Sequence, residues 1–323
     1  QNIPRQISRE FVDTRFQPRF SFSIPALKTY PDRLAANLLI QGFSHGFRLA
    51  YQGPRKAYSC KNLTSVTENP DIVKAKIAEE IAMGRVAGPF DVPPLPDFRC
   101  SPLGLVPKSE EGKFRLIHHL SFPEGDSVNS HISDEDAKVQ YLRCDEAVQV
   151  VASLGVGTEL AKSDLRSAFR TIPVNRADFN LLGFTFEGKY YFDMCLPFGC
   201  RQSCSLYETF SSFLNWLVNK ITGEQLSKHF LDDFIHFGPH TTGKCGKTLR
   251  TFKAVCRYLG VPVAEEKTVE PCTCLTFLGL EIDSVSQQVK VPPDKLAACK
   301  QKLRGALFNP YFTLKELQSL LGF

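Results

Sequence analysis

Apolar residues recur at helical spacing in several parts of the chain. The clearest stretch is 201–221, which predicts a long amphipathic helix that stops before Gly223. Its apolar positions are Leu206, Phe210, Phe213, Leu214, Leu217, Val218 and Ile221. Similar spacing predicts helices at 71–85 and at about 247–259. Further helices are expected near 32–41, over 135–154 and, as a pair, from Pro293 onward.

Short apolar runs bounded by turn residues predict strands between these helices. One strand is expected at Glu159–Asp164. The expected hairpins pair 103–108 with 113–117 through a polar turn at 110–112, 181–186 with 190–194, and the two halves of 229–237. A further strand pair ends at 277–282. Four prolines between 89 and 96 indicate a stiff linker, and residues 1–70, rich in Pro, Arg and aromatic residues, an extended arm.

The order of the central elements is strand, helix, hairpin, helix, strand. This order predicts an α+β fold in which a small antiparallel sheet carries helices on one face, as in split βαβ units. In such a sheet the strand at 159–164 lies beside the hairpin at 230–237. Asp164 and Asp232 are therefore expected to be neighbours, although 68 residues separate them.

Composition is that of a folded chain. Of the 323 residues, 43% are hydrophobic and 23% are charged, which suits two or three subdomains with sizeable cores. No run of about 18 apolar residues occurs, so no membrane span is expected. The first residues lack a signal-peptide pattern, and both ends read as cuts within a longer polypeptide. The eleven cysteines form no framework, which favours reduced thiols and an intracellular location.

Positive charge is concentrated at the front of the chain. Residues 1–60 carry nine Lys and Arg against three acids, whereas the chain as a whole has a net charge of +5. Such a segment fits contact with a phosphate backbone, and it also fits a solvated tail.

The pair Asp232-Asp233 stands where an apolar hairpin should reverse, in His229-Phe230-Leu231-Asp232-Asp233-Phe234-Ile235. Adjacent carboxylates repel each other, and divalent cations relieve that repulsion. Asp is also a common turn residue, so the pair alone does not define a site. With Asp164 added, three carboxylates at neighbouring strand ends can bind two Mg²⁺ ions about 4 Å apart, as in polymerases and nucleases.

Other residues add candidate contacts for a nucleotide. Phe169 follows Asp164 by five residues, where its ring would either form a wall against a 2′-hydroxyl or belong to the core. Lys108 and Arg115 flank the first predicted hairpin and would clamp a triphosphate or lie on a solvated face. Lys267 would approach the leaving group or lie on the surface. The backbone could approach a ligand closely at Leu196-Pro197-Phe198-Gly199, or this segment could simply mark the boundary between a strand and a helix.

Taken in order, these segments resemble the reverse transcriptases over roughly residues 70–323. The motifs that carry the likeness are Ser101-Pro102 through Arg115, Lys162-Ser163-Asp164 with Phe169, Leu196-Pro197-Phe198-Gly199, Phe230-Leu231-Asp232-Asp233, Lys267 and Phe277-Leu278-Gly279. Within that family the chain looks most like retrotransposons of the DIRS type, which also encode a tyrosine recombinase. The segments 42–48, 84–90 and 115–121 carry this narrower likeness.

The resemblance implies a right-hand polymerase fold. Its expected parts are a basic arm at 1–70, fingers at 71–155 with 172–195, a palm at 156–287, and the truncated start of a thumb or connection at 288–323. Two departures from the family pattern are Phe230 in place of the frequent Tyr, and the absence of Pro from the segment 200–204. Neither departure removes a carboxylate.

The resemblance also implies roles for individual residues. Asp164 and Asp232 would be the principal ligands of two Mg²⁺ ions, for which Mn²⁺ can substitute, and Asp233 the third carboxylate. The implied nucleotide-binding residues are Lys108, Arg115, Leu165, Phe169 (as the sugar gate), Phe198, Gly199 and Lys267. Phe277, Leu278 and Gly279 would form the primer grip. The implied partners are an RNA template, a DNA primer, dNTPs and a downstream RNase H domain.

The function expected from these residues is RNA-directed DNA polymerisation, in which a primer 3′-hydroxyl attacks a dNTP and releases pyrophosphate. Two alternatives remain open. One is a catalytically inactive, nucleic-acid-binding remnant of such an enzyme, against which the three intact carboxylates argue. The other is an RNA-dependent RNA polymerase, against which Phe169 argues because it cannot hydrogen-bond a 2′-hydroxyl.

Overall fold

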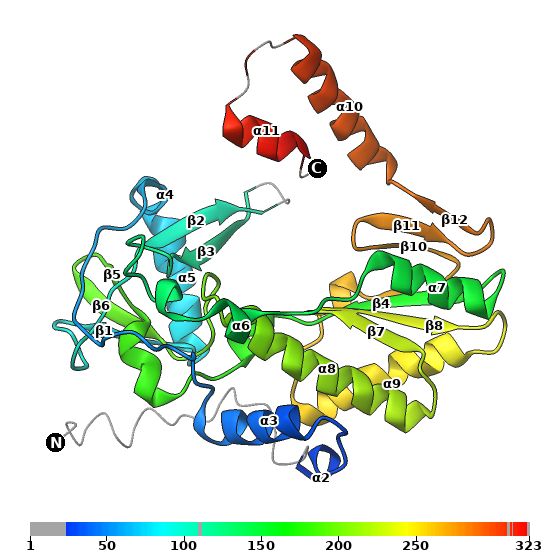
Figure 1. Cartoon of the computed structure of the whole chain (residues 1–323), viewed down its shortest axis with the longest axis horizontal. Helices are drawn as coiled ribbons and strands as arrows, with labels where there is room; N and C mark the ends of the chain where they lie inside the picture. Colours follow the sequence, from blue (N-terminus) through cyan, green and yellow to red (C-terminus); the bar gives the residue numbers. More distant parts are fainter. Residues whose placement is uncertain (1–23, 109–111, 309–310, 312, 322–323) are drawn as a thin grey trace.

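The structure, a computed structural model, describes residues 24–108, 112–308, 311 and 313–321. In these residues the strands form four sheets, ordered β7-β8-β4-β9, β1-β6-β5, β10-β11-β12 and β2-β3. Figure 1 shows the first sheet in one lobe and the sheets of β1–β3, β5 and β6 in another, with α8 extending along the base of the first.

The central sheet contains β4 (Glu159–Asp164), β7 (Ser227–Phe230), β8 (Asp233–Gly238) and β9 (Val269–Cys272). All its neighbouring strands are antiparallel, and Asp164 of β4 lies opposite Asp233 of β8. The two long helices α8 (Ser203–Thr222) and α9 (Lys244–Leu259) cover one face of this sheet, as predicted. Phe234 of β8 and Phe252 of α9 meet there, with ring centroids 4.6 Å apart.

The opposite face of the sheet is also covered, which the predicted arrangement did not include. Because side chains alternate along a strand, Ile235 and Phe237 of β8 point away from α8 and α9. They pack with Ala147 and Val151 of α7 (Cys144–Leu154). The small sheet of β10 (Cys274–Phe277), β11 (Leu280–Asp283) and β12 (Gln288–Lys290) completes this layer.

The single helix predicted at 135–154 is wrong, because the chain there forms two helices, α6 (Asp134–Ala137) and α7. Two side chains at the start of α8, the N-cap Gln202 and Ser205, take the place of continued helical bonding at the end of α6. Gln202 Nε2 and Ser205 Oγ each donate to the carbonyl oxygen of Asp136 at 3.0 Å. Helix α7 then begins after its N-cap residue Arg143, whose N–H donates to the Glu146 carboxylate at 2.8 Å.

The other lobe is built on two smaller sheets. One contains β1 (Val86–Phe90), β5 (Gly183–Phe186) and β6 (Lys189–Asp193), and the other is the hairpin of β2 (Leu103–Pro107) and β3 (Phe114–His118). Helices α4 (Thr64–Glu68) and α5 (Pro70–Ala82) pack against them. The hairpins agree with the sequence prediction, although residues 109–111 of the first turn lie outside the described residues.

The linker predicted from Pro89 to Pro96 begins inside a strand, so its first part is wrong. Val86 and Ala87 pair with β6, and the register shifts between Ala87 and Phe90. Proline has no N–H to donate to a ladder, and such an irregularity is where a strand accommodates it.

Residues 24–58, which we call the N-terminal strap, are docked along both lobes. Helices α2 (Ile24–Leu27) and α3 (Arg33–His45) pack on α8, where Tyr30 lies 5.0 Å from Trp216 between ring centroids. Helix α3 agrees with the helix predicted near 32–41. The remaining helices are short 3₁₀ segments and two C-terminal helices. Their bounds are η2 Asn129–His131, η3 Ala168–Thr171, η4 Arg176–Leu181, η5 Glu265–Lys267, α10 Pro293–Phe308 and α11 Leu314–Leu321.

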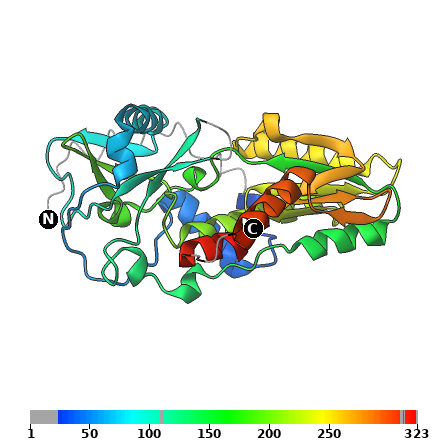
Figure 2. The same ribbon diagram turned by 90° about the horizontal axis from the view of Figure 1, so that it is seen from above.

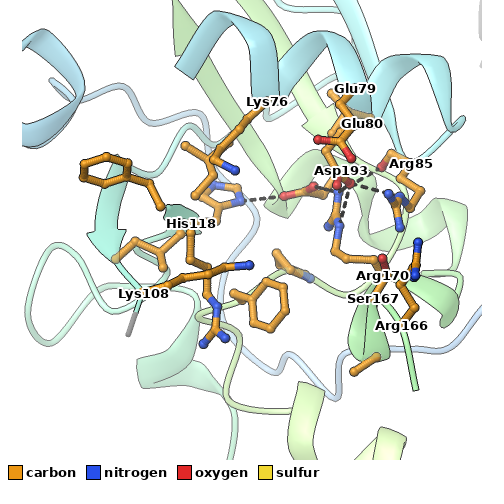
Figure 3. Close-up of a pocket in the computed structure, with 18 of the residues that line it drawn as sticks. Lys76, Glu79, Glu80, Arg85, Lys108, His118, Arg166, Ser167, Arg170 and Asp193 are labelled. Atoms are coloured by element: carbon orange, nitrogen blue, oxygen red, sulfur yellow. Dashed lines mark hydrogen bonds and ion pairs between the residues drawn. The ribbon is translucent and has the colours of Figure 1, made fainter. Parts of the chain in front are cut away.

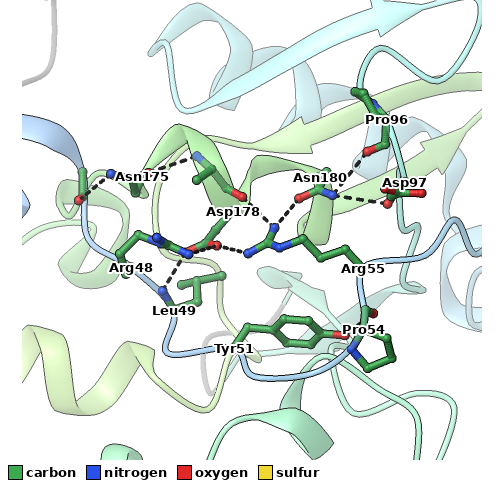
Figure 4. A network of polar contacts seen from close by, with 12 residues as sticks. Arg48, Leu49, Tyr51, Pro54, Arg55, Pro96, Asp97, Asn175, Asp178 and Asn180 are labelled. Atoms are coloured by element: carbon green, nitrogen blue, oxygen red, sulfur yellow. Dashed lines mark hydrogen bonds and ion pairs between the residues drawn. The ribbon is translucent and has the colours of Figure 1, made fainter. Parts of the chain in front are cut away.

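Past α3, the strap is tied to η4 by one buried carboxylate (Figure 4). Asp178 is fully buried and accepts from Arg48 Nε at 2.8 Å, from the N–H of Leu49 at 3.0 Å and from Arg55 Nη2 at 2.5 Å. Arg48 and Arg55, two of the basic residues whose charge suggested contact with a phosphate backbone, are thus paired with a carboxylate of the protein itself. The basic residues of 1–23 lie outside the described residues.

The two helices predicted after Pro293 are present as α10 and α11. Figure 1 shows them above the two lobes, and Figure 2 shows them crossing the middle of the molecule when it is seen from above. Across the described part of the chain, none of the helices combines the length and the apolar character that spanning a bilayer requires.

Candidate active site

The acidic residues meet where β4 ends and β8 begins. The N–H of Leu165 donates to the carbonyl oxygen of Asp232 at 3.0 Å, so Asp164 and Asp232 are neighbours as the strand order predicts. The chain reverses between β7 and β8 through Leu231, whose φ of 52° is left-handed. The tight hairpin therefore fixes Asp232 beside the end of β4.

Asp164 and Asp232 are held in a partly dehydrated setting. Asp164 is 8% exposed, and burial raises its pKa while Lys267, with Nζ 3.1 Å from Oδ1, works in the opposite direction. Burial, followed by the charge of Asp164, raises the pKa of Asp232 to about 6. A cation bound between the two carboxylates would stabilise the charged form of both.

Asp233 faces a different partner. Its Oδ1 lies 3.1 Å from Nζ of Lys162 on β4. Within the described residues, no three His, Cys, Asp or Glu side chains are grouped so that they could hold a metal ion. Of the three aspartates, Asp164 and Asp232 line the same cavity, and hard oxygen ligands of this kind fit Mg²⁺ or Mn²⁺.

A cavity of about 620 Å³ opens beside these two carboxylates. Lys108 and Arg115 of the β2–β3 hairpin line it together with Leu165, Phe198 and Lys267. The guanidinium of Arg115 lies over the ring of Phe198, 4.9 Å from the centroid. Residues predicted separately from five segments thus border one space.

Lys267 reaches this space because η5 is fastened to β4. The N–H of Ala264 donates to the carbonyl oxygen of Asp164 at 2.8 Å, and Leu165 forms a β-bridge with Val263. Arg166, at the start of the next turn, binds Glu266 of η5 with Nη2 2.7 Å from Oε2. Arg166 and Glu266 line the cavity as well.

Phe169 and Gly199 lie near the cavity but are not part of its lining. The Phe169 ring packs against Phe198 and Tyr207, with centroids 5.3 and 5.5 Å away, while its neighbour Ala168 lines the space. Gly199 has φ 120°, and a Cβ there would lie 2.0 Å from the carbonyl oxygen of His118. The close approach that needs this glycine is therefore one to the protein's own backbone.

The segment Phe277-Leu278-Gly279 forms the turn between β10 and β11. Phe277 is fully buried against the central sheet, and Leu278 and Gly279 have φ of 48° and 80°. None of the three lines the cavity.

Sequence reasoning missed a group of four charged residues and one histidine in the cavity lining, labelled in Figure 3. They are Glu80, Arg85, His118, Arg170 and Asp193. One signal was available, because Arg170 interrupts the otherwise uncharged run Ala168-Phe169-Arg170-Thr171-Ile172 that follows a buried strand. A lone Arg that is surrounded by core residues is rarely buried unless it is paired.

Comparisons with known proteins agree with this geometry. Among solved structures, the foamy viral protease-reverse transcriptase dRH in complex with double-stranded DNA superimposes with a TM-score of 0.63 at 20% identity, covering 84% of this chain and 42% of its own. The foamy viral protease-reverse transcriptase in complex with RNA/DNA hybrid gives 0.61 at 22% identity, covering 84% of this chain and 32% of its own. The chain thus spans less than half of either protein. None of the curated proteins matches it significantly.

These likenesses confirm the predicted α+β right-hand polymerase fold. The family model that matches the sequence is the reverse transcriptase (RNA-dependent DNA polymerase), over residues 106–282. That segment is more than half of the chain and runs from the β2–β3 hairpin to β11. The chain therefore belongs to the reverse transcriptase family.

Proposed function

We propose that this chain is an RNA-directed DNA polymerase that transfers a nucleotide from a dNTP to a primer 3′-hydroxyl with release of pyrophosphate. The observation that carries the proposal is the convergence of Asp164 and Asp232 at one cavity that Lys108 and Arg115 also line. Carboxylates that can bind a metal ion and cations that can bind phosphates, bordering one space, match a metal-bound triphosphate.

Asp164 and Asp232 would hold Mg²⁺, or Mn²⁺ in its place, with Asp233 as a third carboxylate after release from Lys162. When two such ions are bound, they activate the attacking hydroxyl and stabilise the leaving phosphate. The residues of the chain bind and orient the substrate around that centre. Arg115 offers a planar fork and Lys108 a point charge to the phosphates.

Further residues have proposed roles in the same site. Leu165, Phe198 and Gly199 would shape the nucleotide and template side, and Lys267 would approach the leaving group. Phe169, which supports Phe198, would act as the sugar gate. Phe277, Leu278 and Gly279 would form a primer grip at their turn.

The proposed partners are an RNA template, a DNA primer and dNTPs. Solved relatives that share the fold are described in complex with double-stranded DNA and with RNA/DNA hybrid, which supports this choice. We further propose an intracellular protein of a retrotransposon, most like the DIRS type, with an RNase H domain downstream. The proposed division remains an arm at 1–70, fingers at 71–155 with 172–195, a palm at 156–287 and a thumb start at 288–323.

Primer extension tests the proposal directly. The wild-type chain, given Mg²⁺ and an oligo(dT)-primed RNA template, should extend the primer with dNTPs, and Asp232→Asn should not. The matched control is Asp91→Asn, because Asp91 is an exposed carboxylate paired with Lys189 and lies outside the cavity lining. Full activity in Asp232→Asn would rule the assignment out.

The same assay separates the alternatives. An inactive remnant would bind primer–template in a salt-dependent manner without extending it. An RNA polymerase would prefer rNTPs. Phe169→Val should admit ribonucleotides, and an unchanged preference for dNTPs in that variant would remove Phe169 as the gate.

A further inference from the structure

Arg170 is an arginine enclosed in the cavity wall directly after Phe169. Its side chain is 8% exposed, and its Nη2 lies 2.8 Å from Glu80 Oε2 and 2.7 Å from Asp193 Oδ1. Its Nη1 donates to the carbonyl oxygens of Cys195 and Leu196 at 3.2 and 3.4 Å. One side chain thus ties the turn after β4 to α5, to β6 and to the segment that leads into Pro197 and Phe198 (Figure 3).

The contacts continue to the hairpin that carries the proposed phosphate-binding cations. Asp193 Oδ2 lies 2.9 Å from His118 Nδ1, and His118 Nε2 donates to the carbonyl oxygen of Gly183 at 3.0 Å. The N–H of His118 donates to the carbonyl oxygen of Phe198 at 2.9 Å. His118 is the last residue of β3, the strand that also contains Arg115.

The electrostatics of the group are those of a closed ionic network. Burial acts to raise the pKa of Asp193, but Arg170 and His118 outweigh it and hold that pKa below its ordinary value. Burial also opposes the charge of Arg170, whereas Asp193 and Glu80 raise its pKa. Arg170 and Asp193 are therefore both charged, and each depends on the other.

A gain in folding stability is a poor explanation for the presence of such a buried ionic network. Removing charges from water costs about as much as their pairing returns, and apolar side chains of similar volume often serve a core equally well. What an ionic network with directional bonds supplies is a unique arrangement of the elements that it joins. Here those elements are the turn with Phe169, the Phe198 segment and the Arg115 strand.

The turn with Phe169 has little to hold it by itself. Ser167, which begins it, has φ 60°, an unfavourable conformation for a residue other than glycine. Its helical part, η3, spans only Ala168–Thr171. Phe169 packs on Tyr207 of α8, and Arg170 of the same turn reaches α5 and β6. The turn is therefore clamped between the palm helix and the fingers elements.

We propose that Arg170 is a positioning residue for sugar selection: its bridge through Asp193 to His118 holds Phe169 at a set distance from the hairpin of Lys108 and Arg115. This inference rests on the proposed polymerase function. With the triphosphate bound by the hairpin and the sugar against Phe169, loosening the bridge widens the space for a 2′-hydroxyl. It acts on the choice of sugar more than on the chemical step.

The test compares kcat and KM for dNTP and rNTP incorporation in Arg170→Met, Arg170→Lys and Asp193→Asn. Arg170→Met should improve rNTP relative to dNTP use by at least tenfold, mainly through a lower KM for rNTPs, and Arg170→Lys should fall between it and the wild type. Asp193→Asn preserves the shape and removes the charge, and should shift the ratio in the same direction. The matched control is Arg176→Met, because Arg176 is an exposed arginine of η4.

The outcomes separate this inference from the function on which it rests. A wild-type chain that does not extend primers refutes the proposed function, and the inference with it. An active wild type combined with a folded Arg170→Met of unchanged sugar ratio refutes the inference alone, as does an equal loss of kcat for both sugars. If Arg170→Met does not fold, as its far-ultraviolet circular dichroism would show, Asp193→Asn decides by the same criterion.

Discussion

Removing the buried carboxylate of Asp178 should destabilise the chain far more than removing an exposed one. In Asp178→Ala, the N–H of Leu49 is left buried without its acceptor, which costs about 1–3 kcal/mol. Arg55, whose side chain is 30% exposed, loses its contact with Asp178 but keeps Ala177 and Asn180 as acceptors. Arg48 is 59% exposed and regains water, so its pair contributes little.

Together these losses amount to about 1–3 kcal/mol, most of it from the buried N–H of Leu49, because neither arginine is left as an unpaired buried charge. With a urea m-value of about 3 kcal/mol/M, the midpoint of unfolding followed by circular dichroism should move to lower denaturant by roughly 0.3–1 M. The fluorescence of Trp216, the single tryptophan of the chain, reports on the docking of the strap because Tyr30 lies against it.

Asp91→Ala is the matched control for this measurement. Asp91 pairs with Lys189 at 2.5 Å, a distance as short as that between Asp178 and Arg55, but its side chain is 84% exposed. Its removal should leave the midpoint unchanged. Equal effects of the two substitutions, or an Asp178→Ala midpoint at the wild-type value, would refute the reasoning that burial, and not pairing distance, decides the contribution.

Three further predictions concern stability. Gly199→Ala should lower the free energy of unfolding by at least ~3 kcal/mol, because a Cβ there meets the backbone oxygen of His118. Gly223→Ala, where φ is 77° and the Cβ meets open space, should lower it by about 1–2 kcal/mol. Both values are measured by urea unfolding. Burial acts to raise the pKa of Asp178, but contacts with Arg48, Leu49 and Arg55 outweigh it and lower that pKa below 3.8. Its stabilisation is therefore complete above that pH and is lost as pH falls through the folded pKa. The difference in unfolding free energy between wild type and Asp178→Asn should shrink below about pH 3.8, and a constant difference would contradict this. Phe252→Ala should cost about 3–5 kcal/mol in the same assay, because its ring is fully buried between α9 and the central sheet, and a loss under about 1 kcal/mol would contradict that packing.

Elements with a strong local signal are those that the sequence predicts best. The helix at 201–221, the strand at 159–164 and the hairpins agree with α8, β4 and the observed strand pairs within a few residues. Periodicity and turn residues act over short distances, and burial of the resulting apolar faces then reinforces them. The helix predicted over 135–154 fails because its interruption depends on Gln202 and Ser205 at the start of α8, about 70 residues further along.

The candidate site also has features that the sequence predicts and features that it does not. The proximity of Asp164 and Asp232 follows from strand order, and Lys108 and Arg115 lie on the hairpin that the sequence predicts. The pairing of Asp233 with Lys162 and the position of Phe169 behind Phe198 have no local signal. Both depend on which face of the strand or turn is covered by other elements in the tertiary structure.

The sequence by itself determined the family, the order of strands and helices, and the residues proposed here to bind a metal-bound triphosphate, because motif chemistry and apolar periodicity are properties of neighbouring residues. Only the tertiary structure decided how buried charges are neutralised. Asp178 meets Arg48 across 130 positions, and Arg170 meets Glu80 across 90. Such pairs form only after the packing of apolar faces has brought distant segments together, and a charge enclosed by that packing must find its partner there, since water is no longer within reach.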